Sequence, residues 1–289
     1  MFPVLFRIGD FVVTTFGLMM LFSFLSAAWI AGRQLERYGM KRDLVWDTLA
    51  LVALGGIAGA KIYYLGLHWQ DLIAAPLREL TSRGGLVWYG GLIGGMTAYY
   101  IQIRRRKLPV ATMYDATAPA LALAYAVGRL GCFLVGDDYG KYTDAWYGIA
   151  FPKGSPPSTA GYLRTVGEDV PVSIPDHQVV TVHPTQLYEI GLALVMFFIL
   201  WNAGGKRLRQ GQLFALYMML YGVERFFIEF VRAKGDRVFL DFSTSQLASL
   251  ALLTAGVLLW SFRRNAPTAP VAGESTRASK APPTAKRTV

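Results

Sequence analysis

The chain has 289 residues, of which 53% are hydrophobic and only 17% are charged, and its formal net charge is +10. Soluble domains carry roughly 25% charged residues, so this composition excludes an ordinary soluble domain and favours a membrane protein. The Lys and Arg residues lie in short clusters between apolar blocks, a placement that argues against a nucleic-acid-binding face. We therefore expect no nucleic acid among the partners.

Apolar blocks recur along the chain, each close to the roughly 20 residues that cross a bilayer as a helix. The first block, 11–31, contains no charged residue and is not followed by a signal-peptidase pattern, so we expect a membrane span rather than a cleaved signal. The fold class we predict is all-α, a polytopic membrane protein with seven transmembrane helices. The predicted spans are 11–31, 48–67, 85–103, 112–135, 186–203, 213–231 and 243–262.

The basic clusters fall on alternate connections between these spans, at 33–42, 104–107, 204–210 and 263–264. Cytoplasmic loops of membrane proteins carry an excess of Lys and Arg. The pattern therefore predicts that the N-terminus lies outside the cytoplasm and the C-terminus inside.

Two segments lie outside the predicted spans. The connection 137–180 is too long for a bare turn and is rich in Gly, Pro, Ser and Thr, so we expect a small, partly ordered extracytoplasmic lobe. Residues 266–289 have no apolar periodicity and are rich in Ala, Pro, Thr and Lys, which predicts a disordered, basic cytoplasmic tail. The transmembrane domain then comprises residues 1–265, including the lobe.

Ionisable side chains within a membrane cost about 2.5–3.5 kcal/mol on insertion scales, so they usually face a cavity or a partner. Lys61 and Asp115 can also be explained by positions near span ends. Arg225 and Glu229 share one helix face, and the simplest interpretation of that pair alone is mutual neutralisation. Arg129 lies about one turn from the outer end of the fourth span. The candidates in the predicted spans are Lys61, Asp115, Arg129, Glu224, Arg225 and Glu229.

Arg129 and Arg225 together make a stronger case than either alone, because both approach the outer leaflet from different spans. Guanidinium groups bind phosphate through two parallel hydrogen bonds and stay charged at any working pH. A lipid phosphate entering sideways is the natural anion for such a site. Residues 90–95 (GGLIGG) permit close helix packing, and behind Trp88 and Tyr89 they also leave room for a headgroup.

Five stretches, in this order, resemble the prolipoprotein diacylglyceryl transferase family: FPVLFRIGDFVVTTFGLMML, GGLVWYGGLIGG, VGRLGCFLVGDDYG, HPTQLYE and YGVERFFIEFVR. The resemblance spans residues 2 to about 262. It implies an enzyme that transfers the diacylglyceryl group of phosphatidylglycerol to the lipobox cysteine of a preprolipoprotein, with release of glycerol phosphate and without a metal or cofactor. It also implies a location among the lipids of the bacterial inner membrane.

The resemblance assigns roles to individual residues. Arg129 and Arg225 fall on the essential arginines of the family and would hold the phosphate. Glu229 would orient Arg225 or transfer a proton, and Asp137 stands where the family commonly has Glu. The substrate-binding positions that we expect besides the two arginines are Phe16, Tyr89, Gly90, Gly91, Cys132, Gly140, His183 and Gln186.

Three polar positions of the family are changed in this chain: Tyr89 replaces a histidine, Cys132 an asparagine and Phe16 a tyrosine. A tyrosine, with a reference pKa of about 10, is a poor general base near pH 7, although it can hydrogen-bond a phosphate or ester oxygen within the catalytic site.

These changes leave alternatives open. The chain is either an active variant or a paralogue with an altered substrate or no activity. A transporter or lipid-binding protein that uses the same arginines for anion recognition is a third possibility. The bases open to an active variant are Asp137, Glu229 and His183.

Overall fold

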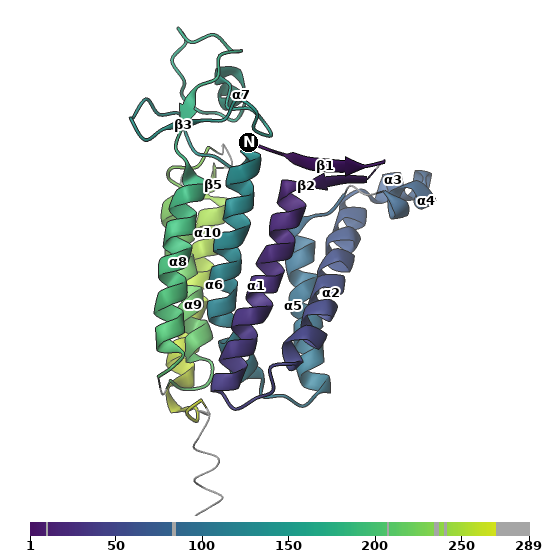
Figure 1. Ribbon diagram of the computed structural model, residues 1–289, viewed down its shortest axis with the longest axis vertical. Helices are drawn as coiled ribbons and strands as arrows, with labels where there is room; N and C mark the ends of the chain where they lie inside the picture. Colours follow the sequence, from purple (N-terminus) through teal and green to yellow (C-terminus); the bar gives the residue numbers. More distant parts are fainter. Residues whose placement is uncertain (10, 83–84, 207, 234–236, 240–241, 270–289) are drawn as a thin grey trace, which may run out of the picture.

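The computed structural model describes all residues except 10, 83–84, 207, 234–236, 240–241 and 270–289. Long helices run side by side, and a smaller lobe lies at one end of them (Figure 1). We call this end the lobe end. The long helices are α1 (Thr15–Arg37), α2 (Leu44–Leu67), α5 (Trp88–Arg105), α6 (Val110–Val135), α8 (Thr185–Ala203), α9 (Gln212–Ile228) and α10 (Thr244–Phe262).

Five helical segments in the described part of the chain are long and apolar enough to cross a membrane: α1, α2, α6, α8, and α10 together with the 3-10 turn η1 (Arg263–Asn265). This is the pattern of a multi-pass membrane protein. Only 6% of the most apolar window of α2 is buried, so this helix requires an apolar environment such as lipid. The shorter helices α5 and α9 run beside these five without meeting the same length and hydropathy.

The predicted spans each overlap one long helix, but the limits of the first were wrong at both ends. Residues 11–14 pair as strand β2 (Phe11–Thr14) with β1 (Val4–Ile8), and α1 begins only at Thr15 and continues to Arg37. The Thr14 side chain accepts a hydrogen bond from Gly17 N at 3.1 Å, which caps the helix there. The valines of β2 are β-branched and favour the hairpin over helix.

The all-α prediction holds for the long helices but missed several short elements at the lobe end. Besides β1 and β2, two more antiparallel pairs form, and two short helices connect α2 to α5 (Figure 1). These elements are β3 (Ile149–Ala150) with β4 (Thr181–Val182), β5 (Arg237–Phe239) with β6 (Phe242–Ser243), α3 (Trp69–Ala74) and α4 (Pro76–Thr81).

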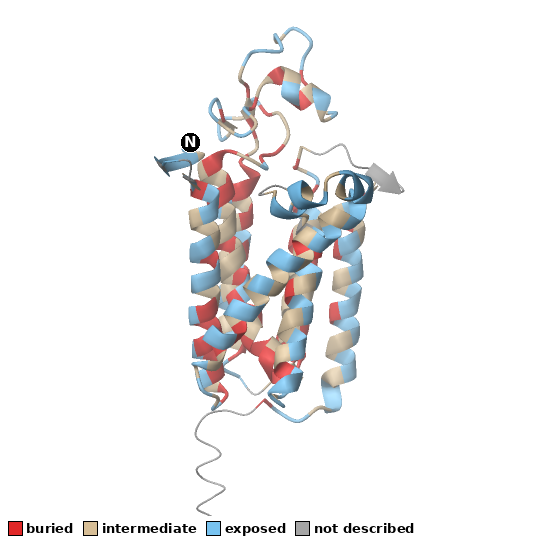
Figure 2. Ribbon diagram, turned by 90° about the vertical axis from the view of Figure 1, so that its right-hand side faces the viewer, coloured by how far each residue is buried: buried red, intermediate tan, exposed pale blue. Residues whose placement is uncertain are grey.

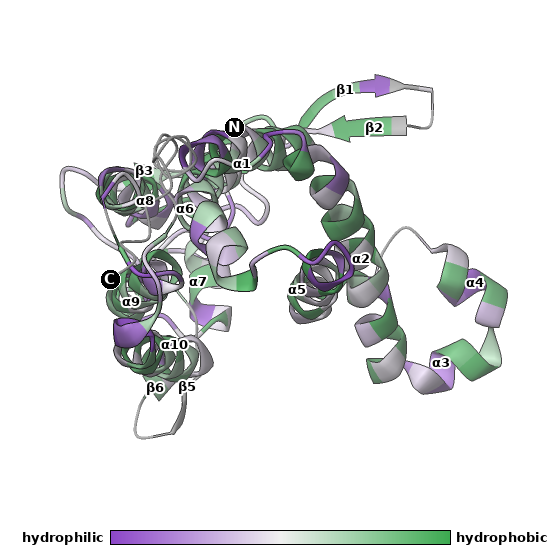
Figure 3. Ribbon diagram, turned by 90° about the horizontal axis from the view of Figure 1, so that it is seen from below, coloured by the Kyte–Doolittle hydropathy of each residue, from purple (hydrophilic) through white to green (hydrophobic). Residues whose placement is uncertain are grey.

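The long helices divide into two groups. Helices α1, α6, α8, α9 and α10 pack in succession, whereas α2 and α5 pack mainly on each other, as the view along the helices shows (Figure 3). The second pair is joined at its glycines. A Cβ atom placed on Gly59 of α2 would lie 2.4 Å from the carbonyl oxygen of Gly90 on α5, and one on Gly94 would lie 2.2 Å from that of Gly55. Only glycine allows the two backbones this approach.

Buried residues lie on the long helices and in the lobe (Figure 2). Two apolar clusters of the helices share α6, one with residues of α1 and the other with residues of α8 and α9. Two charged residues of the predicted spans have local structural partners. The carboxylate of Asp115 accepts hydrogen bonds from Gly211 N and Phe214 N, at 2.6 and 2.8 Å, at the first turn of α9. Lys61 Nζ donates to the carbonyl and hydroxyl oxygens of Ser82 at 3.0 and 2.8 Å.

The predicted lobe is ordered and has a small core of its own. Phe151 and Leu163 are completely buried there, and the ring of Phe151 stacks on Tyr139 at 5.3 Å. A short helix, α7 (Ala160–Thr165), covers this core, and β4 extends the lobe to Val182.

The first four residues of the predicted disordered tail are ordered. Residues 266–269 are held against 208–210, because Ala269 N donates to the carbonyl oxygen of Leu208 at 2.8 Å and Gln210 N donates to that of Pro267 at 3.0 Å. The backbone thus forms a pairing that the composition did not indicate. The rest of the predicted tail, 270–289, lies outside the described residues.

The glycine contact between α2 and α5 gives a test of this packing. Gly59→Ala should lower the thermal unfolding midpoint, because overpacking a tight contact typically costs about 1–3 kcal/mol. Gly66→Ala on the same helix is the matched control, since a Cβ there meets no atom within 4 Å. The measurement is thermal unfolding of the purified full chain in detergent. Equal midpoints for the two variants would contradict the described contact.

Candidate functional site

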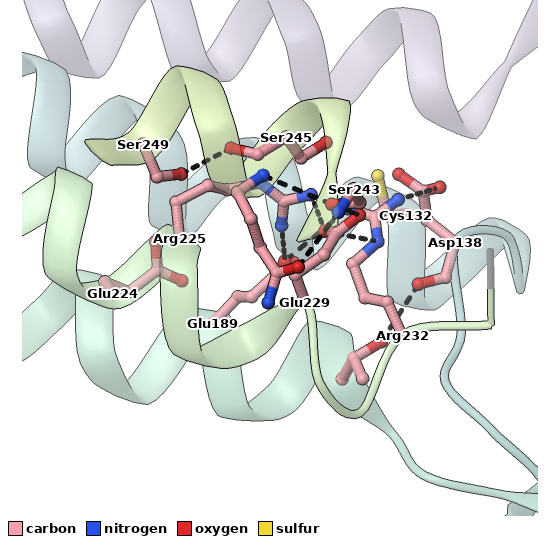
Figure 4. A network of polar contacts seen from close by, with 12 residues as sticks. Cys132, Asp138, Glu189, Glu224, Arg225, Glu229, Arg232, Ser243, Ser245 and Ser249 are labelled. Carbon is pink, nitrogen blue, oxygen red and sulfur yellow. Dashed lines mark hydrogen bonds and ion pairs between the residues drawn. The ribbon is translucent and has the colours of Figure 1, made fainter. Parts of the chain in front are cut away.

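The centre of the candidate site is a buried carboxylate between two arginines. Glu189, in the second turn of α8, is completely buried at the lobe end of the helices. Arg129 Nε of α6 lies 2.5 Å from its Oε2. Arg225 Nη1 of α9 lies 3.0 Å from its Oε1 (Figure 4). The two arginines that the sequence singled out therefore meet on one residue of a third helix.

Two more carboxylates and a third arginine complete this network. Arg225 Nη2 lies 2.6 Å from Glu229 Oε2. Asp138, which follows α6, bridges two arginines: its Oδ2 lies 2.9 Å from Arg129 Nη1 and its Oδ1 lies 2.6 Å from Arg232 Nη2 (Figure 4). Arg232 also lies 3.8 Å from Glu189. We call these residues the arginine cluster: Arg129, Arg225, Arg232, Asp138, Glu189 and Glu229.

The arginine cluster balances its own charge, with as many carboxylates as guanidinium groups. Removing one partner of a buried ion pair leaves an uncompensated charge and typically costs about 3–5 kcal/mol. A neighbouring polar group also contacts the arginine cluster: Ser243 Oγ, at the N-cap of α10, lies 3.2 Å from Glu229 Oε1. The guanidinium groups are thus held in fixed positions, a property that anion recognition requires.

Gly140 lies where the backbone of the lobe contacts the backbone next to the arginine cluster. Its N–H donates to the carbonyl oxygen of His183 at 2.8 Å, and it forms an isolated bridge with Arg232. A Cβ atom at position 140 would lie 2.4 Å from the carbonyl oxygen of Val231 and 2.7 Å from Thr185 Cγ2. The structure therefore gives this glycine a role in close backbone packing, next to the expected role in substrate binding.

Asp137 and Cys132 lie beside the arginine cluster at the end of α6. Gln186 Nε2 donates to the carbonyl oxygen of Asp137 at 2.6 Å and fixes this part of the backbone. The Asp137 side chain is half-buried, its Oδ1 has no hydrogen-bond partner among the described residues, and burial raises the pKa of its carboxyl group. Cys132 Sγ lies 3.9 Å from Arg129 Nη1. A carboxylate and a thiol thus lie near the same arginine.

His183 lies at the base of the lobe. Its ring nitrogen Nδ1 lies 3.3 Å from the hydroxyl oxygen of Tyr188. Burial, together with the charge of Lys141, lowers the pKa of the imidazole below its ordinary value, which favours the neutral form near pH 7.

Phe16 lies on α1, which packs on α6, whereas Tyr89, Gly90 and Gly91 lie on α5. Phe16 is in the first turn of α1, where its Cδ2 would lie 3.9 Å from a Cβ atom on Gly131, one residue before Cys132. Tyr89 lies at the start of α5 with about half of its side chain exposed, and Gly90 and Gly91 face the backbone of α2. The structure thus brings Phe16 to the end of α6 near the arginine cluster but places Tyr89, Gly90 and Gly91 on a helix that packs mainly on α2.

Sequence reasoning missed the centre of the arginine cluster. The candidate residues did not include Glu189, Asp138 or Arg232. A signal existed for Glu189, because a carboxylate in the second turn of an otherwise apolar span requires a cation. Glu224 also lies here, with its Oε1 3.4 Å from the hydroxyl oxygen of Tyr125.

The arginine cluster has the chemistry of an anion site that is partly open. The side chain of Asp138 is 37% exposed, whereas that of Glu189 is only 1% exposed. A phosphate in the place of Asp138 on Arg129 would leave Glu189 to keep the guanidinium groups oriented. Bidentate binding to two guanidinium groups would also stabilise negative charge that develops on a leaving phosphate.

Comparison with known proteins agrees with this chemistry. The family model of prolipoprotein diacylglyceryl transferase matches residues 3–262. A phosphatidylglycerol–prolipoprotein diacylglyceryl transferase of Clostridium tetani (strain Massachusetts / E88) is 31% identical over 265 residues, which cover 91% of this chain and 98% of the relative. The proteins of the same name from Xylella fastidiosa (strain 9a5c) and Aeromonas salmonicida (strain A449) are 34% and 32% identical, over 89% of this chain and 91% and 88% of the relatives.

The match to the family model extends from the β1–β2 hairpin to the last long helix, a range that contains every residue of the arginine cluster. The chain belongs to the prolipoprotein diacylglyceryl transferase family.

Proposed function

We propose that this protein transfers the diacylglyceryl group of phosphatidylglycerol to the lipobox cysteine thiol of preprolipoproteins and releases glycerol phosphate. The observation that carries the proposal is the convergence of Arg129 and Arg225 on the buried Glu189, in a chain that matches the family over nearly its whole length. The relatives that match are bacterial and carry this activity in their names.

In the proposed reaction, the peptide thiol attacks the glyceryl carbon that carries the phosphate. A sulfur–carbon bond forms and the carbon–oxygen bond to the phosphate breaks, so that glycerol phosphate leaves with the bonding electrons. Arg129 and Arg225 bind the phosphate and stabilise this charge. Glu229 orients Arg225, and Tyr89 hydrogen-bonds the headgroup. The proposed substrate-binding surface also includes Phe16, Gly90, Gly91, Cys132, Gly140, His183 and Gln186.

The thiol proton needs an acceptor, because a thiol with a reference pKa of about 8.5 attacks as the thiolate. Among the candidates, Glu229 is held by Arg225 and Ser243, and His183 lies at the base of the lobe. Asp137 is half-buried beside Arg129, and its carboxyl pKa is raised by burial, which brings its basicity closer to the working pH. We therefore assign the proton-accepting role to Asp137.

The proposed setting is the bacterial inner membrane, with seven spans, the lobe end outside and the opposite end in the cytoplasm. The described helices α5 and α9 would then be the third and sixth spans, even though they are shorter than the others. Basic residues support this orientation, since Arg104 and Arg105 end α5 and Arg263 and Arg264 follow α10 at the end away from the lobe. Phosphatidylglycerol can then reach the arginine cluster from the outer leaflet.

A second candidate function rests on Tyr89, Cys132 and Phe16, which replace polar residues of the family. A non-catalytic or substrate-altered paralogue would bind precursor or lipid without forming a product. Complementation of a bacterium depleted of its own diacylglyceryl transferase separates the two, with one lipobox reporter followed by mass. A reporter that gains a diacylglyceryl group supports the enzyme. A correctly inserted protein that leaves it unmodified, also in its native lipids, supports the paralogue.

The arginines should be needed for chemistry rather than insertion. Arg129→Ala and Arg225→Ala should each lower lipid transfer by about 100- to 1000-fold or more, the range for losing one group that stabilises transition-state charge. The measurement is the mass of the modified reporter, with membrane insertion checked by fractionation. Arg106→Ala is the matched control, because Arg106 pairs with Asp47 at an exposed position, 2.7 Å away. Full activity in both cluster variants would rule out the assigned site.

Asp137 should set the acidic limb of the pH dependence. Its carboxyl group accepts the thiol proton only when ionised, and its pKa is raised, so activity should fall as pH drops through this raised pKa. Asp137→Asn should lower kcat by about 100- to 10,000-fold, whereas Asp137→Glu should retain activity. Asp138→Asn serves as the neighbouring comparison: it should keep an acidic limb but shift it to lower pH, because the charge of Asp138 helps to raise the Asp137 pKa. An unchanged acidic limb in Asp137→Asn would assign the base elsewhere.

The proposed orientation predicts a labelling pattern in intact cells. Val172 in the lobe is 95% exposed, so Val172→Cys should react with a membrane-impermeant maleimide added to spheroplasts. Arg104→Cys, at the end of α5 away from the lobe, should react only after lysis. The unaltered chain, whose one cysteine is buried, gives the background. The reverse pattern would contradict the proposed orientation.

A further inference from the structure

A groove lies between α1 and α8 at the end of the helices away from the lobe. It has a volume of about 470 Å³ and is lined by Trp29, Arg33, Glu36, Arg37 and Trp201. Both helices pack on α6, and polar contacts connect them at this end. Gln34 Nε2 donates to the carbonyl oxygen of Gly204 at 3.1 Å, and Arg37 Nη1 donates to that of Trp201 at 2.9 Å.

The charge of this groove is positive. The Arg37 guanidinium lies over the Trp201 ring, 3.5 Å from its centroid, and so is held facing the groove wall. Arg33 pairs only loosely with Glu36, at 3.7 Å, with both side chains about half exposed, a geometry that contributes little to stability. A phosphate diester would give Arg33 a better partner, because guanidinium–phosphate pairs are bidentate.

The walls of the groove continue along the helices as apolar surface. Trp29, Leu25 and Phe22 lie four and three residues apart, share one face of α1 and are exposed. On α8, Phe198 is exposed one turn before Trp201. Tryptophan is the residue that membrane proteins place at the level of lipid headgroups, with acyl chains on one side and water on the other.

We propose that this groove binds the headgroup of an anionic phospholipid, with Arg33 and Arg37 on the phosphate and the acyl chains against Phe22, Leu25 and Phe198. The site is separate from the arginine cluster. Trp201 follows Glu189 by 12 residues on α8, a rise of about 18 Å along the helix axis. Under the proposed orientation, the bound lipid belongs to the cytoplasmic leaflet and is a structural ligand, whereas the diacylglyceryl donor belongs to the outer leaflet.

Quenching of tryptophan by brominated acyl chains tests this site in the full chain. The protein is reconstituted in phosphatidylcholine bilayers that contain either brominated phosphatidylserine or brominated phosphatidylcholine. Phosphatidylserine is anionic but is not the proposed diacylglyceryl donor, so failure of this test and failure of the proposed enzyme activity are distinguishable. The signal of the groove is the difference between the unaltered chain and Trp29→Phe/Trp201→Phe.

The groove signal should reach half-maximal quenching at about fivefold lower mole fraction of the anionic lipid, the preference that one basic side chain near an anionic surface typically gives. Arg33→Gln should remove most of this preference without affecting folding, since Arg33 contacts only Glu36 in the described ion pairs. Arg104→Gln/Arg105→Gln, which removes two exposed cations at the same end outside the groove, should keep it.

Three results would overturn the proposal. The first is equal quenching by the two lipids, which would make the groove an ordinary lipid-facing surface. The second is loss of the preference in the Arg104→Gln/Arg105→Gln control, which would assign it to general surface charge. The third is abolition of the preference by millimolar inorganic phosphate, which would make the groove a site for a soluble anion.

Discussion

The buried carboxylate of Glu189 is the group on which the rest of the site depends. Arg129 and Arg225 come from different helices and would repel each other in an apolar medium without a shared anion. Glu189 removes that repulsion and keeps both guanidinium groups at the lobe end of the bundle. Because Glu189 is completely buried, an ion from solvent cannot take its place between the two arginines. The more exposed Asp138 is therefore the member of the arginine cluster that can give way to a phosphate.

Much of the fold was predictable because its signals are local. Apolar blocks predicted each long helix, and the start of α8 was predicted to within one residue. The pairing of β1 with β2 was not predictable from apolarity, because a run of valines and phenylalanines is equally typical of a strand and of a membrane-spanning helix. Strand β2 pairs with β1, and the cap at Thr14 fixes the start of α1. The contact of 266–269 with 208–210 depends on distant backbone and left no pattern in the composition.

The candidate site was predictable in part. Charged residues are rare in apolar blocks, which made Arg129, Arg225 and Glu229 recognisable. The structure confirms the pairing expected on one helix face, because Arg225 and Glu229 form an ion pair. Glu189 and Arg232 were missed because helix spacing reports neighbours on one helix and says nothing of partners across the bundle. For Gly90 the sequence left packing and headgroup binding open, and its contact with Gly59 supplies a packing reason.

The distribution of the arginine cluster along the chain has a consequence for biosynthesis. About 60 residues separate Arg129 from Glu189, and Arg225 follows some 36 residues later. At a synthesis rate of about 5–20 residues per second, Arg129 waits several seconds for Glu189 to leave the ribosome. During that interval Asp138, nine residues after Arg129, is the carboxylate already available to this cation. The complete arginine cluster therefore forms only after α8 and α9 have been synthesised, so that its assembly joins the two halves of the chain late.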